Sequence, residues 1–335
     1  MKIAVQAWTP EYGSEMEVSW DEGRPADLDT TAEGAGWKAL PSGAQGDLTW
    51  DEVLFVDGVR RTDARLFVTP DGSDRAAAGV AASIGVGAVS CDIGAGSGAP
   101  VRAARIAAAK VMRVIALGGG GDIQLSGGPG LEYRGLPVAS FAPDDLDHKV
   151  HGLMRDSEAV LAIEFAAAIG SDRLVVVDGP LAKMNPGATA VIGMIKSHNA
   201  TYLDDTENAL VSALERGERT PFFFFGGPQR PRYSWYLRLC ERDDDMHGWH
   251  GIVRCEVPAA HSVGTVTTLA DASTCLLPRF ASLPHWDARA PQNLVPIAGL
   301  EKHLRHLLGD RELAYRKIRG AALRLSGAAG GERVA

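Results

Sequence analysis

Cysteine is scarce in this sequence: its 335 residues include 4 cysteines, and no two of them form a CxxC pair. Such scattered positions provide no disulfide framework and exclude the common zinc-ribbon patterns. The sequence also starts without a recognisable signal peptide. We therefore expect reduced thiols and a cytoplasmic protein.

Long hydrophobic runs are missing as well. The longest apolar stretch, residues 103–117, is interrupted by Arg105, Lys110 and Arg113. It therefore falls short of the roughly 18 apolar residues that a membrane-spanning helix needs. We expect no association with a membrane.

An excess of positive charge is absent too, because the formal net charge is −8. This argues against a general nucleic-acid coat protein but leaves room for an acidic metal site beside a local basic channel. Residues 301–325 carry seven Lys or Arg against three acids. That stretch fits either a DNA channel or a solvated helix face.

Several motifs of catalysis and phosphate binding are also lacking. The glycines at 118–121 follow no GxGxxG or Walker pattern, and no GxSxG elbow occurs. The spacing of Cys240, His247, His250 and Cys255 fits no common zinc site. The chemistry must be sought among the carboxylates.

What the sequence does contain is a succession of strand-like and helix-like segments. Residues 53–57, 64–70 and 80–92 predict an antiparallel meander, with the GVRRTD segment as a turn or bulge after the first strand. Residues 103–117 fit a strand or a helix, and 118–147 fit a loop. Further along we expect a helix at 149–169 that stops at Gly170, a strand at 173–179, a helix or strand at 188–197, a helix at 206–217 capped by Thr206, strands at 221–226, 231–241 and 248–258, and helices at 263–276, 296–308 and 311–325.

This order predicts an α/β protein with a mixed sheet flanked by helices, rather than a regular series of βαβ units. We expect residues 1–50 to form an irregular N-terminal lead-in and residues 326–335 a disordered tail. The main domain would cover 51–325, with a core at about 51–215 and additional C-terminal strands and helices at 216–325.

Two aspartates stand at the ends of apolar runs, in LFVDG and LVVVDG. Asp57 and Asp178 would lie on neighbouring parallel strands, where two close carboxylates repel each other unless a cation lies between them. Oxygen ligands favour Mg²⁺ or Mn²⁺. The alternative is that each Asp-Gly pair is an ordinary exit from a strand into a turn.

A third carboxylate is expected from the helix at 149–169. The strand from Arg173 to Asp178 covers about 20 Å, which corresponds to about 13 helical residues. Counting back from Ile169 arrives near Asp156 and Glu158. We therefore select Glu158, with Glu164 as the second choice.

In order and spacing, LFVDG, the helix, LVVVDGPL, IGMIKS and the segment 278–310 resemble the NurA nuclease family in its bacterial form. The resemblance implies an RNase H-like fold and a Mn²⁺- or Mg²⁺-dependent DNA nuclease with 5′–3′ exonuclease and single-strand endonuclease activity. It also implies a homodimer that works with a HerA-like hexameric ATPase on single-stranded DNA and duplex ends, in end resection and double-strand break repair.

The resemblance assigns roles to particular residues. Asp57 and Asp178 match the metal-binding aspartates, Glu158 or Glu164 the helical glutamate, and Lys196 the lysine of the family's Gly-x-x-Lys. The Tyr and His that archaeal members carry near the metals are missing here. The polar groups available instead are Arg289, Gln292 and Asn293, with His285 or Asp287 as further candidates.

We expect two ions at this site, about 3.5–4 Å apart. Asp57 would bridge them, and Asp178 and Glu158 would each hold one. His285 would protonate the leaving group or serve only as a helix cap, while Lys196, Arg289 and Gln292 would contact DNA. Two other functions stay open: a catalytically inactive, dimeric adaptor for the ATPase, and a hydrolase of small phosphodiesters.

Overall fold

The computed structural model describes most of the chain. The described residues are 27–34, 36–41, 50–69, 76–93, 103–168, 173–181, 190–197, 202–226, 231–243 and 245–331. No described helix is long and apolar enough to cross a membrane. The expected stop at Gly170, most of the lead-in and the last four residues lie outside the described residues.

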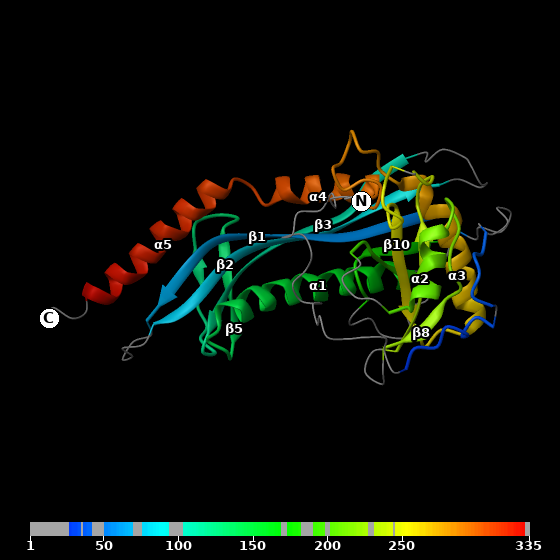
Figure 1. Cartoon of the computed structure of the whole chain (residues 1–335). Coiled ribbons are helices and arrows are strands. Elements are labelled where there is room, and N and C mark those ends of the chain that lie inside the picture. The colour runs from blue at the N-terminus through cyan, green and yellow to red at the C-terminus, as the bar shows by residue number, and fades with distance from the viewer. Residues whose placement is uncertain are drawn as a thin grey trace. The chain divides into compact units, whose positions relative to one another are not determined.

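The described strands form a 10-stranded mixed sheet in the order β4-β5-β3-β2-β1-β6-β7-β10-β9-β8. Three neighbouring strands are long: β1 (Glu52–Val68), β2 (Ala77–Asp92) and β3 (Ala103–Gly118) (Figure 1). β6 (Arg173–Asp178) pairs in parallel with β1, and β7 (Val191–Ile195) pairs in parallel with β6. The expected mixed α/β architecture is confirmed.

Antiparallel strands complete one end of the sheet. β10 (Ile252–Pro258) lies between β7 and β9 (Arg232–Arg238), and β8 (Phe223–Phe225) pairs with β9. The two strands expected at 231–241 and 248–258 therefore form an antiparallel pair. At the other end, β5 (Glu132–Val138) pairs in parallel with β3 and antiparallel with β4, a two-residue strand at Leu125–Ser126.

The helices are α1 (Pro143–Ala167), α2 (Asp205–Ala213), α3 (Val263–Leu276), α4 (Val295–Leu307) and α5 (Arg311–Gly331), and a 3₁₀ turn, η3 (Leu277–Phe280), follows α3. The bounds of α3 agree with the prediction. α5 continues to Gly331, and the expected tail at 326–335 remains a prediction. The cap of α2 is Asp204 rather than Thr206, because Asp204 and Glu207 form a reciprocal capping box.

Two predictions about single segments are also corrected, and two segments left open between strand and helix are decided. β1 is continuous, so the GVRRTD segment is not a turn. Its buried Asp63 accepts hydrogen bonds from Tyr133 and from the Ser83 hydroxyl on β2, which compensate the burial of a charge in a strand. The segment 118–147 contains β4, β5 and the start of α1 rather than a loop. Residues 103–118 and 191–195 are strands, which decides the two ambiguous segments.

The chain divides into two compact units. The first contains Met1–Asp57, Ala88–Ala107 and Ala159–Leu300, and the second contains Gly58–Gly87, Ala108–Glu158 and Glu301–Ala335. In the first unit, residues 29 and 40 of the lead-in form isolated bridges with Phe224 and Arg219. Each unit has a core cluster of its own. The clusters are Leu203, Val211, Leu214, Phe223, Phe225, Tyr236 and Ile252 in the first, and Ala64, Ala81, Ile115, Leu125, Tyr133, Ile318 and Ala321 in the second.

Candidate metal centre

The register of two parallel strands brings Asp57 and Asp178 together. Val56 of β1 is the partner of Val177 of β6, so the next residue on each strand is an aspartate. Side chains alternate between the faces of a sheet, and partners in register share a face. The two carboxylates therefore point from the same face, as the sequence predicted.

Local structure also fixes where Asp178 ends its strand. Residues 174–177 are buried, and Gly179 then adopts a φ of 119° that a side chain would disfavour. The Gly179 N–H donates to the Met194 carbonyl oxygen at 2.8 Å. The chain thus turns immediately after the carboxylate, which leaves Asp178 at the rim of the sheet.

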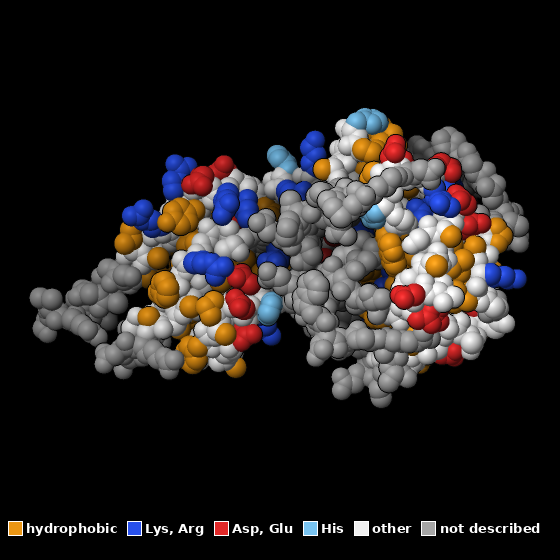
Figure 2. Space-filling view, viewed as in Figure 1, with side chains coloured by type: hydrophobic (Ala, Val, Ile, Leu, Met, Phe, Trp, Pro, Cys, Tyr) orange, Lys and Arg blue, Asp and Glu red, His pale blue; other side chains and the backbone are white. Residues whose placement is uncertain are grey.

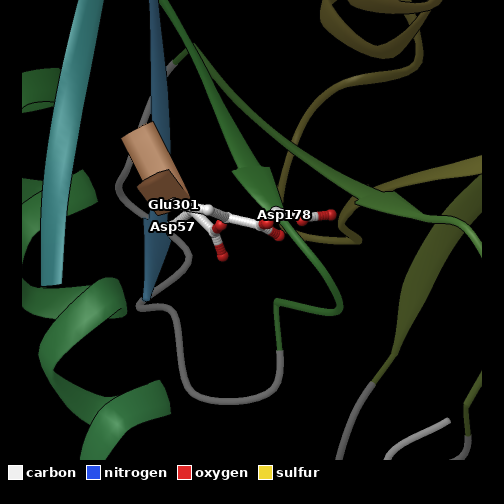
Figure 3. A group of neighbouring side chains, drawn as sticks. All are labelled: Asp57, Asp178 and Glu301. Carbon is white, nitrogen blue, oxygen red and sulfur yellow. The ribbon is translucent and has the colours of Figure 1, made fainter. Parts of the chain in front are cut away.

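A third carboxylate belongs to this group. Asp57, Asp178 and Glu301 each present an oxygen, and these oxygens all lie within 4.8 Å of one another (Figure 3). Glu301 comes from α4, and its exposed fraction is 3%. The sequence analysis missed this residue.

Glu158 is not a member of that carboxylate group. It is buried on α1, where Arg155 Nη1 donates to its Oε2 at 3.1 Å. A Cβ added to Gly58, the neighbour of Asp57, would lie 2.4 Å from Glu158 Oε1. The alternative residue, Glu164, is exposed. Of the two predicted residues, Glu158 remains the candidate ligand.

Lys196 contacts the carboxylate group directly. Its Nζ donates to Asp178 Oδ2 at 2.5 Å and to Asn293 Oδ1 at 2.8 Å. Asn293 is fully buried, and its Nδ2 donates to Asp287 Oδ2 at 2.6 Å. A continuous polar chain therefore runs from Asp178 through Lys196 and Asn293 to Asp287.

The remaining predicted residues lie on the segment before α4. Arg289 is held by Asp287, with 3.2 Å between Nε and Oδ1. Gln292 is buried, whereas His285 is exposed and its ring packs edge-on against Trp286. Of the candidates on this segment, Asn293 accepts a hydrogen bond from Lys196, and Asp287 supports it.

The donor set of the group suits a hard divalent cation. Its three members offer carboxylate oxygens, which are the ligands that Mg²⁺ and Mn²⁺ prefer. Bringing three carboxylates within 4.8 Å of one another is electrostatically unfavourable unless positive charge is placed among them. Lys196 at Asp178, and Arg305 at 3.2 Å from Glu301, provide part of it.

A sequence signal for Glu301 did exist. Ile297 and Leu304 are buried on α4, and Glu301 lies four residues after the first and three before the second. This spacing places it on the apolar face of the helix. Among the described residues, the cysteines and histidines near 240–255 form no group comparable to that of the three carboxylates.

No family model matches this chain, and no curated protein matches it. Among solved structures, it is similar to the crystal structure of the NurA nuclease from Sulfolobus solfataricus. The similarity covers 84% of this chain and 88% of that one, at 11% sequence identity and a TM-score of 0.43. These values are too low to support an argument about function.

Proposed function

We propose that this protein is a metal-dependent DNA nuclease. The observation that carries the proposal is the group of Asp57, Asp178 and Glu301, whose carboxylate oxygens lie within 4.8 Å of one another. The strand order β3-β2-β1-β6-β7, with β1, β6 and β7 parallel, supports an RNase H-like core. In such a core, acidic side chains on central strands face the scissile phosphodiester.

The roles of the side chains follow from their positions. Asp57, Asp178 and Glu301 would hold divalent cations, and Glu158 is the candidate for an additional ligand. When bound, such cations supply an activated water and neutralise charge on the phosphate. Lys196 places a further ammonium group at Asp178, where the anionic phosphate approaches. Asn293 and Asp287 orient that ammonium group.

Recognition of DNA would depend on local charge, because the net charge is −8. On the face drawn in Figure 2, acidic and basic side chains are interspersed. Lys302 and Arg305 of α4 are exposed and follow Glu301 in the sequence. We include in the proposal single-stranded DNA and duplex ends as substrates, a HerA-like hexameric ATPase as partner, homodimerisation, and Arg289 and Gln292 as further DNA contacts.

Replacing Asp57 by Asn tests the activity. The wild type should cleave a single-stranded DNA oligonucleotide in the presence of Mn²⁺, with cleavage abolished by EDTA. Asp57→Asn should lower the rate by about 1,000-fold, because loss of a ligand removes several kcal/mol of transition-state stabilisation. Cleavage products resolved on a denaturing gel provide the measurement.

Asp205→Asn is the matched control, since Asp205 is exposed in the first turn of α2. It should cleave at the rate of the wild type. Equal cleavage by Asp57→Asn, or none by the wild type, would reject the nuclease.

One observation favours a second candidate, the catalytically inactive adaptor. Asp178 and Glu301 each have a cationic partner within the protein, Lys196 and Arg305, so cations of the chain itself neutralise part of the group. An adaptor should bind DNA or the ATPase and show no Mn²⁺ binding by isothermal titration calorimetry. A Mn²⁺ isotherm that Asp57→Asn abolishes would exclude this form of the adaptor.

A further inference from the structure

Glu256 is a buried carboxylate that accepts four hydrogen bonds and that the proposed reaction does not use. It lies on β10 with an exposed fraction of 1%. Arg232 Nη1 donates to its two oxygens at 2.8 and 2.9 Å, and Arg254 Nη1 donates to Oε2 at 3.0 Å. The fourth hydrogen bond comes from the backbone N–H of Leu181, at 2.8 Å from Oε1.

The bond to Leu181 connects Glu256 to the metal site. Leu181 follows Asp178 by three residues, and between them the chain turns at Gly179. The first peptide of the turn is held by the bond from Gly179 N–H to the Met194 carbonyl oxygen. Glu256 holds the far side of the same turn. Both ends of the segment that follows Asp178 are therefore attached to neighbouring strands.

Gly193 allows this attachment. It is the register partner of Glu256 on one side and of Val177 on the other. A Cβ at this position would lie 2.8 Å from Leu181 Cγ, 2.9 Å from the Gly179 carbonyl oxygen and 3.2 Å from Glu256 Cγ. Because its φ is not positive, glycine is needed here for space rather than for backbone conformation.

The arginines that bind Glu256 are themselves fixed. The Arg254 guanidinium carbon lies 5.0 Å from the Tyr202 ring centroid and 5.5 Å from that of Phe225. Arg232 lies over the same Phe225 ring at 5.6 Å. Stacking on aromatic faces restricts both side chains. The two arginines therefore hold the Glu256 carboxylate in a fixed position.

A purely structural role explains this arrangement incompletely. A buried ion triad is often no more stabilising than apolar residues of the same volume. The fourth hydrogen bond of Glu256 gives the triad a further role, because it holds the turn after a proposed metal ligand. Groups that orient ligands from outside the coordination sphere typically contribute 10–100-fold to metal affinity.

We propose that Glu256 is a positioning residue for Asp178: it holds the Gly179–Leu181 turn across the space left by Gly193, and so fixes the Asp178 carboxylate for a divalent cation. The proposal rests on the proposed function, because it requires that Asp178 binds the ion. It adds two residues, Glu256 and Gly193, to those on which the metal site depends.

Two variants test it by different routes, with Mn²⁺ as the probe. Glu256→Gln weakens the ion pairs, whereas Gly193→Ala leaves every charge in place and displaces the turn by its methyl group. Each should raise the Kd for Mn²⁺ 10–100-fold in isothermal titration calorimetry, and saturating Mn²⁺ should restore the cleavage rate. Gly264→Ala is the control, because a Cβ there meets nothing within 4 Å.

The outcomes separate the two proposals. If the wild type binds Mn²⁺ through Asp57 and both variants bind it equally well, the positioning role is wrong and the nuclease proposal stands. If the wild type binds no Mn²⁺, both fail. Should Glu256→Gln not fold, Gly193→Ala decides. Rapid amide hydrogen exchange at Leu181 in the folded wild type would overturn the positioning role independently of either variant.

Discussion

At the scale of single residues, the ammonium group of Lys196 is the feature that most affects the carboxylate group. Its Nζ lies 2.5 Å from Asp178 Oδ2, so it occupies one oxygen that a divalent cation would otherwise use. The positive charge of Lys196 therefore affects the binding of the substrate and of the metal ion in opposite directions. A positive charge here attracts the phosphate and repels the ion.

Lys196→Met should separate these demands. Removing a like charge near the ion should favour Mn²⁺ binding by ~1 kcal/mol, which lowers the Kd about fivefold. The cleavage rate at saturating Mn²⁺ should fall, because the phosphate loses a cation. Titration calorimetry and steady-state cleavage measure the two effects. Lys196→Arg, which keeps the charge, is the control. A joint loss of affinity and rate would show instead that Lys196 mainly orients Asp178.

Asp57 and Asp178 could be predicted from the sequence because each follows an apolar run, and parallel pairing of such runs places them in register. Glu301 could not be found by the same reasoning, since it lies inside a helix rich in Lys, Arg and His. The bonds from Lys196 to Asn293, and from Asn293 to Asp287, join residues up to 97 positions apart. No local pattern encodes such a contact.

At the scale of elements, the start of α2 shows how a cap is chosen among several candidates. The sequence offers Asp204, Asp205 and Thr206 in succession. Asp204 Oδ1 accepts from Glu207 N, and Glu207 Oε2 accepts from Asp204 N, both at 2.9 Å. The glutamate three residues later decides the cap, and the sequence-based choice of Thr206 overlooked it.

Asp204→Ala should therefore lower the free energy of unfolding by ~1 kcal/mol, the usual contribution of an N-cap. Urea denaturation followed by circular dichroism measures the loss. Asp205→Ala removes a neighbouring acid that only interacts with the helix dipole, and it should change the stability by a smaller amount. Equal losses in the two variants would contradict the capping box.

Helices and strands with a regular apolar spacing could be predicted from the sequence. Those that depend on contacts with distant residues could not. The helix expected at about 263–276 is α3, where the Ser262 cap and the apolar spacing agree. The sequence analysis predicted two strands in place of β1, because the middle of β1 is polar. Arg61, which donates to Asp63 at 2.7 Å, and Tyr133 supply the partners that keep this polar stretch in the sheet. Those partners are visible only in three dimensions.

At the scale of the whole molecule, the free energy of unfolding at low pH should depend on the ion triad of Glu256, Arg232 and Arg254. Burial alone raises the pKa of Glu256, but Arg254, Arg232 and the hydrogen bonds outweigh it, and the net pKa is lowered. A carboxyl group with a depressed pKa in the folded state stabilises the fold above its unfolded pKa. That contribution is lost as the pH falls through the folded pKa.

Glu256→Gln should therefore be less stable than the wild type at neutral pH, because the buried Arg254 and the half-buried Arg232 lose their counter-ion. Below the ordinary glutamate pKa of 4.5, the difference should narrow as the wild type loses the ionised form. Urea unfolding of both proteins between pH 7 and pH 3 gives the two curves. A difference that stays constant over this range would show that the fold does not lower the pKa of Glu256.

The two compact units could not be predicted as segments, since each is assembled from three separate stretches of the chain. Composition and apolar patterning locate strands and helices along the sequence. They do not show which stretches return to the same core. The nuclease domain assigned to residues 51–325 remains a prediction, as does the boundary of its core near 215.

The position of Asp57 within β1 limits how this protein can change over evolution. The aspartate is the sixth residue of a 17-residue strand, with hydrogen-bonded neighbours before and after it. Inserting or deleting one residue between Glu52 and Asp57 would rotate the carboxylate to the opposite side of the sheet. Substitutions along the strand leave this geometry in place. A change in the length of the strand before Asp57 would move its carboxylate away from Asp178 and Glu301.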